Sequence, residues 1–144
     1  MKRIFFIVSL VLFACTASLP LSAKVRLPRL VSDRMVLQRD TELKIWGWAS
    51  PGEKVTVRFR GKHYNTEADA KGNWLVLLPP QQAGGPFLLE VNELAIRDVL
   101  VGDVWLCSGQ SNQETPIARL TEMFPEINVS NNHMIRHYKV RRIQ

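Results

Sequence analysis

KVTVRFR, at residues 54–60, alternates apolar and polar side chains along its whole length. Val55, Val57 and Phe59 fall on one side of an extended chain, and the residues between them are all polar or charged. A period of two is typical of an antiparallel strand with one face on a core and the other in water. This stretch therefore predicts a β-domain and shows no helical period.

Turn residues lie on both sides of this strand and recur up to about residue 100. Ser50-Pro51-Gly52-Glu53 precedes the strand and Gly61-Lys62 follows it, and both have the composition of tight turns. Short strands at regular spacing between turn signals predict a β-sandwich for residues 24–100. The other expected strands lie at residues 43–49, 63–68, 74–78 and 87–91.

Three tryptophans in this region, Trp46, Trp48 and Trp74, allow two interpretations. Aromatic rings bury a large apolar area, so they most often pack in a core or against a sheet face. Rings on an exposed face also stack against sugars. Packing is the simpler interpretation, and a carbohydrate-stacking platform is the alternative.

A longer, mostly apolar run begins near residue 96 and continues to Cys107, interrupted by Gly102-Asp103. Such a run fits a strand that is buried on both faces, as in an α/β sheet. Thr115 and Pro116 then have the composition of a helix start, with Thr115 as the cap. Residues 101–144 are therefore predicted to open a parallel α/β domain. The expected order is a strand ending at 107, a polar loop at 108–112, a helix from 115 to 124 and a strand at 134–140.

The first 23 residues have the three parts of a secretory signal peptide. Lys2 and Arg3 form a positively charged start, residues 4–13 are almost entirely apolar, and Leu21-Ser22-Ala23 supplies small residues at a cleavage site. The apolar run is too short to span a bilayer as a helix. We therefore expect cleavage after Ala23 and export to the periplasm or the extracellular space.

The two cysteines do not form a disulfide framework in the exported chain. Cys15 leaves with the leader. A loose match to a lipoprotein signal, weakened by the bulky Phe13, makes lipid attachment at Cys15 the alternative. Cys107 then stands alone, which also excludes a cysteine metal site. Because Cys107 ends an apolar string, we expect a buried, inert thiol, with a cysteine nucleophile as the alternative.

Charge and spacing exclude several kinds of partner. Without Lys2 and Arg3 the chain has 17 basic and 13 acidic residues, a net charge of +4 that is scattered along the sequence. This charge is too mild to argue for nucleic-acid binding. Zinc-ligand spacing and a phosphate loop are both absent from the sequence, so we expect neither a metal nor a cofactor.

The motif Gly109-Gln110-Ser111-Asn112 lies between the expected strand and the expected helix. Open α/β sheets place their ligand crevices at the carboxyl ends of strands, and the start of a helix presents N–H groups to a developing oxyanion. Ser111 is thus well placed for a nucleophile, although its hydroxyl needs a base. The spacing alone is weak evidence, because Gln113 stands where a hydrolase elbow has its second glycine. On spacing alone, loop and capping roles for Ser111 and Asn112 are the simpler interpretation.

Residues 102–112, GDVWLCSGQSN, closely resemble the nucleophile segment of sialate O-acetylesterase-like proteins, which belong to the SGNH hydrolase superfamily. Similar strings lie upstream at residues 30–39, 46–49, 51–53 and 72–74. The resemblance therefore covers nearly all of the exported chain.

This resemblance implies a β-sandwich followed by an SGNH-hydrolase-like, flavodoxin-like α/β domain. It makes Ser111 the catalytic nucleophile and the backbone N–H of Ser111 one oxyanion donor, with Gln110 and Asn112 as substrate-binding neighbours. The implied reaction is hydrolysis of O-acetyl esters on sugars, sialic acid included. An acetylated sugar is then the expected partner, without a metal or a cofactor.

Two departures from the family pattern bear on activity. Gln113 stands where the family usually has an apolar residue. The family's glycine and asparagine oxyanion donors and its Asp-x-x-His element lie farther downstream and do not occur in this sequence; His63, His133 and His137 are interpreted as surface or strand histidines. We therefore expect a truncated chain that lacks the catalytic histidine and aspartate and is inactive alone. A non-catalytic carbohydrate-binding or structural β-domain is the alternative function.

Overall fold

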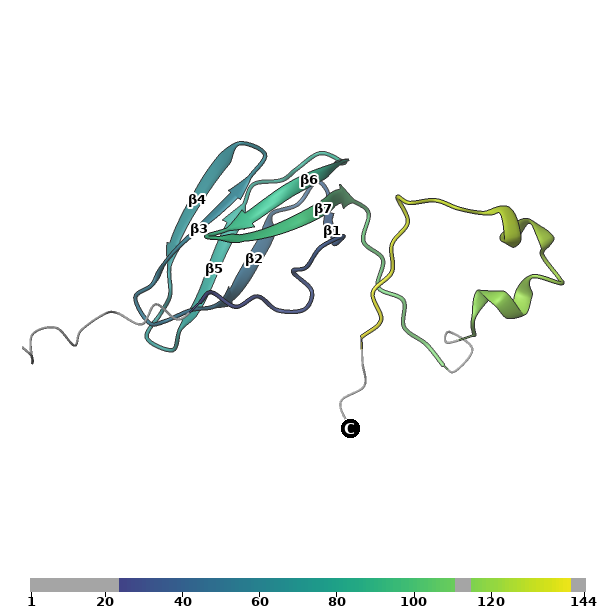
Figure 1. Ribbon diagram of the computed structural model, residues 1–144, viewed down its shortest axis with the longest axis horizontal. Helices are drawn as coiled ribbons and strands as arrows, with labels where there is room; N and C mark the ends of the chain where they lie inside the picture. The colour runs from purple at the N-terminus through teal and green to yellow at the C-terminus, as the bar shows by residue number, and fades with distance from the viewer. Residues whose placement is uncertain (1–23, 111–114, 141–144) are drawn as a thin grey trace, which may run out of the picture.

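The computed structural model describes residues 24–110 and 115–140, which are mainly β-sheet (Figure 1). Seven strands are followed by two short 3-10 helices in these residues. The elements are β1 Val36–Gln38, β2 Leu43–Trp48, β3 Lys54–Phe59, β4 Lys62–Glu67, β5 Asn73–Leu78, β6 Gly84–Val91, β7 Leu94–Gly102, η2 Ile117–Leu120 and η3 Pro125–Val129.

The strands form two sheets. β1, β7, β6, β3 and β4 make a five-stranded sheet in that order, and β2 and β5 make a two-stranded sheet. All pairs are antiparallel except β1 and β7, which run parallel. The prediction of a mostly β-structure is therefore confirmed. The strands expected at residues 43–49, 54–60, 63–68, 74–78 and 87–91 are present as β2 to β6.

The alternation in β3 has the predicted effect on burial. Val55, Val57 and Phe59 are buried, and the residues between them are not. β2 and β5 add Ile45 and Leu78 to the same core cluster, so the two sheets bury their inner faces together. Full burial of an apolar side chain of this size contributes about 1.5–3 kcal/mol to stability. This shared core therefore holds the two sheets together.

Trp74 lies in this core at 3% exposure, next to Gly47. A Cβ atom at Gly47 would clash with the carbonyl oxygen of Arg26 and lie 2.8 Å from the Trp74 ring. Arg26 passes so close because its N–H and carbonyl both pair with the backbone of Trp48. The packing interpretation thus holds for Trp74. Trp46 and Trp48 instead lie on the outer face of the two-stranded sheet, 37% and 38% exposed.

The apolar run that begins at residue 96 differs from its prediction. Its first part belongs to β7 in the five-stranded sheet and is not the first strand of an α/β domain. Residues 104–107 are not a strand, and Trp105 and Leu106 are 84% and 93% exposed. A strand buried on both faces needs neighbouring strands and covering helices, and no described segment supplies them. The prediction of a buried Cys107 is wrong for the same reason, since this residue is exposed.

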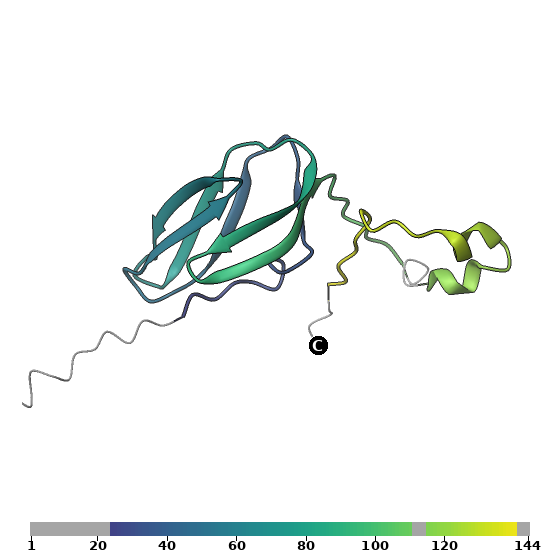
Figure 2. The ribbon, with the colours of Figure 1, turned by 45° about the horizontal axis from the view of Figure 1, so that its top comes forward.

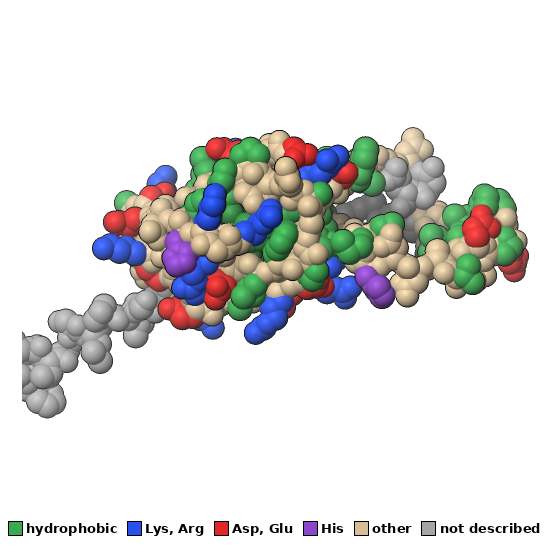
Figure 3. Space-filling model, turned by 90° about the horizontal axis from the view of Figure 1, so that it is seen from above, with side chains coloured by type: hydrophobic (Ala, Val, Ile, Leu, Met, Phe, Trp, Pro, Cys, Tyr) green, Lys and Arg blue, Asp and Glu red, His purple; other side chains and the backbone are tan. Residues whose placement is uncertain are grey.

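The helix expected from Thr115 and the strand expected at 134–140 are also not observed. In their place are the two 3-10 helices η2 and η3, neither of which buries a residue. A short helix without a packed apolar face is marginal in water, and Pro125 interrupts the run. This segment projects from the sheets (Figure 2) and has hydrophobic side chains at its surface (Figure 3). None of the helices in the described residues is long and apolar enough to cross a bilayer.

Candidate active site

The segment that leads to the nucleophile motif leaves the sheet where β1 and β7 end together, with Gln38 opposite Gly102. Oε1 of Gln38 accepts a hydrogen bond from the backbone N–H of Val104 at 2.9 Å. The backbone N–H of Arg39 donates to the carbonyl oxygen of Gly102, also at 2.9 Å. These two hydrogen bonds, one from a side chain and one from the backbone, continue the contact between the two chain segments past the ends of β1 and β7. They fix the direction in which the chain departs.

The charges at this exit are paired. Nε of Arg39 lies 2.8 Å from Oδ1 of Asp103, and Nη1 of Arg39 lies 3.1 Å from Oδ2 of Asp40. The hydrogen bond with Asp103, followed by the charges of Asp103 and Asp40, raises the pKa of Arg39 above its ordinary value. All three side chains are about half exposed, so water screens these pairs. They orient the exit of the chain more than they stabilise the fold.

The structure places the motif residues only in part. Ser108 and Gln110 are exposed at the end of the departing segment. Ser111 and Asn112 lie outside the described residues. The path of the chain is therefore defined up to Gln110, and the roles of Gln110, Ser111 and Asn112 stay predictions.

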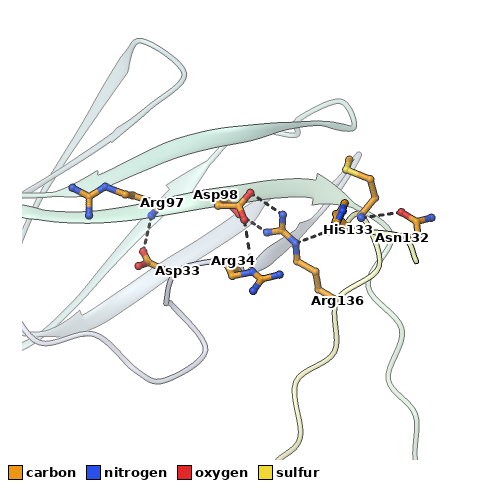
Figure 4. Close-up of polar contacts among 8 residues, drawn as sticks. Asp33, Arg34, Arg97, Asp98, Asn132, His133 and Arg136 are labelled. Atoms are coloured by element: carbon orange, nitrogen blue, oxygen red, sulfur yellow. Dashed lines mark hydrogen bonds and ion pairs between the residues drawn. The ribbon is translucent and has the colours of Figure 1, made fainter. Parts of the chain in front are cut away.

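The three histidines lie on the surface in two places. His63 is on β4, at the opposite edge of the sheet from β1. His133 and His137 are exposed in the last described segment, where the carbonyl oxygen of His133 accepts a hydrogen bond from Nε of Arg136 at 3.4 Å (Figure 4). Within residues 24–110 and 115–140, no imidazole is hydrogen-bonded to a carboxylate, the pairing that orients a catalytic base. No three metal-binding side chains of these same residues are grouped to hold an ion.

A polar hollow of about 430 Å³ lies at the end of β3. β3 runs in the same direction as β7, so the hollow is at the same end of the sheet as the departing segment. Arg60 and Lys62 line it together with the amide side chains of Gln81 and Gln82 and the ring of Tyr64. Nη1 of Arg60 donates a hydrogen bond to Oε1 of Gln81 at 3.2 Å, and Nε2 of Gln81 donates to the carbonyl oxygen of Pro79 at 2.8 Å, so part of this polar lining is already paired.

One cluster of charged side chains, centred on Asp98, was not predicted from the sequence. Asp98 on β7 contacts two arginines that are distant in the chain, Arg34 at 3.7 Å and Arg136 at 2.8 Å (Figure 4). The available signal was the pair Arg97-Asp98, two charged residues inside an otherwise apolar strand. Two adjacent charged residues break the alternation of a strand, as a bulge does, but the pair does not indicate which residues bind it.

Comparison with known proteins supplies the family. No family model matches the chain. Sialate O-acetylesterase from Mus musculus is 34% identical over 112 residues, covering 67% of this chain and 21% of the relative. The Homo sapiens enzyme of that name is 37% identical over 105 residues, covering 62% of this chain and 20% of the relative. The chain belongs to the sialate O-acetylesterase family. It spans about one fifth of the length of these relatives.

A solved structure agrees with this assignment to the sialate O-acetylesterase family. A carbohydrate acetylesterase from Xanthomonas citri matches 76% of this chain and 26% of its own, with a TM-score of 0.73 and 45% sequence identity. The mostly β-structure described above is thus one that a carbohydrate acetylesterase also contains. The resemblance drawn from residues 102–112 and the upstream strings is confirmed.

Proposed function

We propose that this chain is the part of a sugar O-acetylesterase that carries the catalytic serine, Ser111. The whole enzyme would hydrolyse O-acetyl esters of sialic acid or related sugars. The observation that carries the proposal is membership of the sialate O-acetylesterase family, with 45% identity to a structurally similar carbohydrate acetylesterase. The family motif at residues 102–112 supports Ser111 as the nucleophile.

The reaction follows from serine chemistry. Oγ of Ser111 attacks the acetyl carbonyl carbon while a base accepts the hydroxyl proton. Backbone N–H groups, that of Ser111 among them, hydrogen-bond the oxyanion of the tetrahedral intermediate. Its collapse transfers the acetyl group to Oγ and releases the sugar hydroxyl, which takes the proton from the base. Water, deprotonated by the same base, then releases acetate and restores Ser111.

The base for this reaction is proposed to come from outside the described residues. A positioned base contributes about 100- to 10,000-fold to such a rate, and His63, His133 and His137 lack the orienting carboxylate. We therefore expect this chain alone to hydrolyse an activated acetyl ester no faster than its Ser111→Ala variant. Clear activity that depends on Ser111 would mean that one of these histidines or a second chain supplies the base.

The division of the chain into a signal peptide, a β-sandwich and the start of an α/β domain is also proposed. We infer that the two sheets are the β-sandwich of the family and that residues 101–144 begin an SGNH-type α/β domain. Two sheets around one core support the first inference. The exposed apolar residues 104–107 support the second, because they would become buried only beside further parallel strands. Residues 1–23 are proposed as a signal peptide, and the enzyme as an exported one.

A second candidate function, sugar binding without catalysis, is favoured by one observation. Trp46 and Trp48 lie on the same outer face, with the guanidinium of Arg26 5.9 Å from the centre of the Trp48 ring. Exposed indole rings can stack against a sugar ring. Loss of polysaccharide binding in Trp46→Ala would support this function, and equal binding by the variant and the unaltered chain would exclude it for this face.

The substrate class is tested in a chimera. Residues 24–144 replace the corresponding part of the Xanthomonas citri acetylesterase, which they match at 45% identity. The chimera is expected to release acetate from an O-acetylated sialic acid or from an acetylated neutral sugar. The ratio of the two rates, compared with the ratio for the unaltered Xanthomonas citri enzyme, shows what residues 24–144 contribute to substrate choice. A chimera that folds as judged by circular dichroism but releases acetate from neither would contradict the proposed function.

A further inference from the structure

A bulge interrupts β7 at Arg97 and Asp98. β6 and β7 pair through Leu89 with Ile96 and then through Phe87 with Val99, so β7 has one residue more than β6 in this interval. Asp98 takes up the extra length with a φ of 56°. Few residues other than glycine accept this left-handed conformation, and aspartate is among them. Bulges of this kind redirect backbone and side-chain groups out of the ladder.

The loop before β1 holds this bulge in place (Figure 4). Oδ1 of Asp33 accepts a hydrogen bond from the backbone N–H of Arg97 at 2.7 Å. The backbone N–H of Arg34 donates to the carbonyl oxygen of Arg97 at 2.9 Å. These contacts occupy the polar backbone groups of Arg97 and leave the carbonyl and carboxylate of Asp98 facing the last described segment.

Arg136 fills the acceptor site that the bulge offers. Nη2 of Arg136 lies 2.8 Å from Oδ1 of Asp98, and Nη1 donates to the carbonyl oxygen of the same residue. The Arg136 side chain is 12% exposed, whereas every other residue from 131 to 140 is exposed. A guanidinium with two donors on one residue is held in both position and orientation. This differs from Arg34, whose contact with Asp98 is longer and whose side chain is 69% exposed.

We propose that Asp98 is a positioning residue that, through Arg136, fixes residues 130–140 to the β-sheet. The segment between Val104 and Arg136 is then attached to neighbouring strands at both ends, by Gln38 of β1 and by Asp98 of β7. Ser111 lies within that segment. The role of this segment in catalysis rests on the proposed function, whereas its attachment does not.

Hydrogen exchange of this chain, followed by mass spectrometry, tests the attachment without any esterase activity. The variants are Asp98→Asn, Arg136→Gln and the double variant. Asparagine accepts the left-handed conformation, so Asp98→Asn removes the charge and keeps the bulge. The readout is the exchange of the Met134 and Ile135 amides, which donate hydrogen bonds to Asn132 at 2.9 and 3.1 Å. Each single variant releases the segment that holds these bonds and should speed their exchange by about tenfold. The double variant should add little to either single change.

A matched control separates the positioning role from a general loss of charge. Asp103→Asn removes the same charge from an ion pair of the same length, 2.8 Å to Arg39, and should leave exchange in residues 130–140 unchanged. Arg136→Lys keeps the charge but not the paired donors and should fall between Arg136→Gln and the unaltered chain. Protection of β3 and β6 shows that each variant is folded. Unchanged exchange at 130–140 in Asp98→Asn, or fully additive effects in the double variant, would overturn the proposal.

Discussion

Oε1 of Gln38 accepts a hydrogen bond from the backbone N–H of Val104 at 2.9 Å, although the two residues are 66 positions apart in the sequence. β1, the shortest strand of the molecule's described part, therefore directs the segment that leads to Ser111. Parallel pairing makes this possible, because β1 and β7 then run in the same direction and end side by side, with Gln38 opposite Gly102. Arg136 binds Asp98 farther back along β7, the strand from which the chain departs. The described segments on either side of the proposed site are thus held by β1 and β7.

Gly47 is expected to tolerate no side chain. In Gly47→Ala the new methyl group would clash with the carbonyl oxygen of Arg26 and crowd the Trp74 ring. Forcing a methyl group into a packed site costs about 1–3 kcal/mol or more, so urea unfolding should show a loss of at least that size. Gly102→Ala is the control, since its Cβ would meet only Val36, at 3.8 Å, and it should stay within about 0.5 kcal/mol. Equal stability of Gly47→Ala and the unaltered chain would contradict this packing.

Asp69 is expected to make the stability of the β-structure depend on acid pH. The backbone N–H of Asn73, then its side-chain amide, hydrogen-bond the Asp69 carboxylate and lower its pKa from the ordinary value of 3.8. A lowered pKa in the folded state adds stability above pH 3.8, and this contribution is lost as the pH falls through the folded-state value. Thermal unfolding should therefore separate Asp69→Asn from the unaltered chain at neutral pH and bring the two together in acid. A separation that persists throughout the acid range would show that the titration of Asp69 is not its cause.

Cys107 is expected to react freely in the native chain. It is exposed, and its neighbours Trp105 and Leu106 are exposed as well. In a chain that begins at Lys24, Cys107 is the only cysteine, and a thiol reagent should label it at nearly the rate found in denaturant. Labelling more than about 100-fold slower in the native chain would indicate a buried thiol and a packed strand at residues 104–107.

The local patterns of the sequence predicted the strands and missed the long-range contacts. Alternation in residues 54–60 and the turns around it depend on neighbouring residues alone, so β2 to β6 were predictable. The pairing of β1 with β7 joins residues 36–38 to residues 100–102 and leaves no local signal.

The sequence offered a motif for the candidate site, whereas the geometry around it was not predicted. Residues 104–107 have the composition of a buried strand whether or not the strands that would flank them are present, which is why that prediction failed. The Asp98 bulge depends on a left-handed φ and on an arginine far along the chain, and neither can be read from the charged pair Arg97-Asp98. Ser111 is proposed as the nucleophile from the family motif, because spacing alone does not distinguish it from a loop serine.

The leader is expected to be removed between Ala23 and Lys24. The positively charged start, the apolar run and the small residues before this bond are those of a secretory signal peptide. N-terminal sequencing of the exported protein should give Lys24 as the first residue. A first residue at a lipid-modified Cys15 would establish a lipoprotein instead, and an intact Met1 would show that the leader is retained.

The proposed function depends most on Ser111, and one measurement tests the role of this residue most directly. In the chimera with the Xanthomonas citri acetylesterase, hydrolysis of an activated acetyl ester is compared for the unaltered, Ser111→Ala and Ser108→Ala forms. Loss of a serine nucleophile typically lowers kcat by more than about 10,000-fold, so Ser111→Ala should fall to background. Ser108→Ala removes a hydroxyl three residues away in the same loop and should keep activity within a few-fold. A Ser111→Ala chimera as active as the unaltered one would contradict the central claim, and so would an equal loss in both variants.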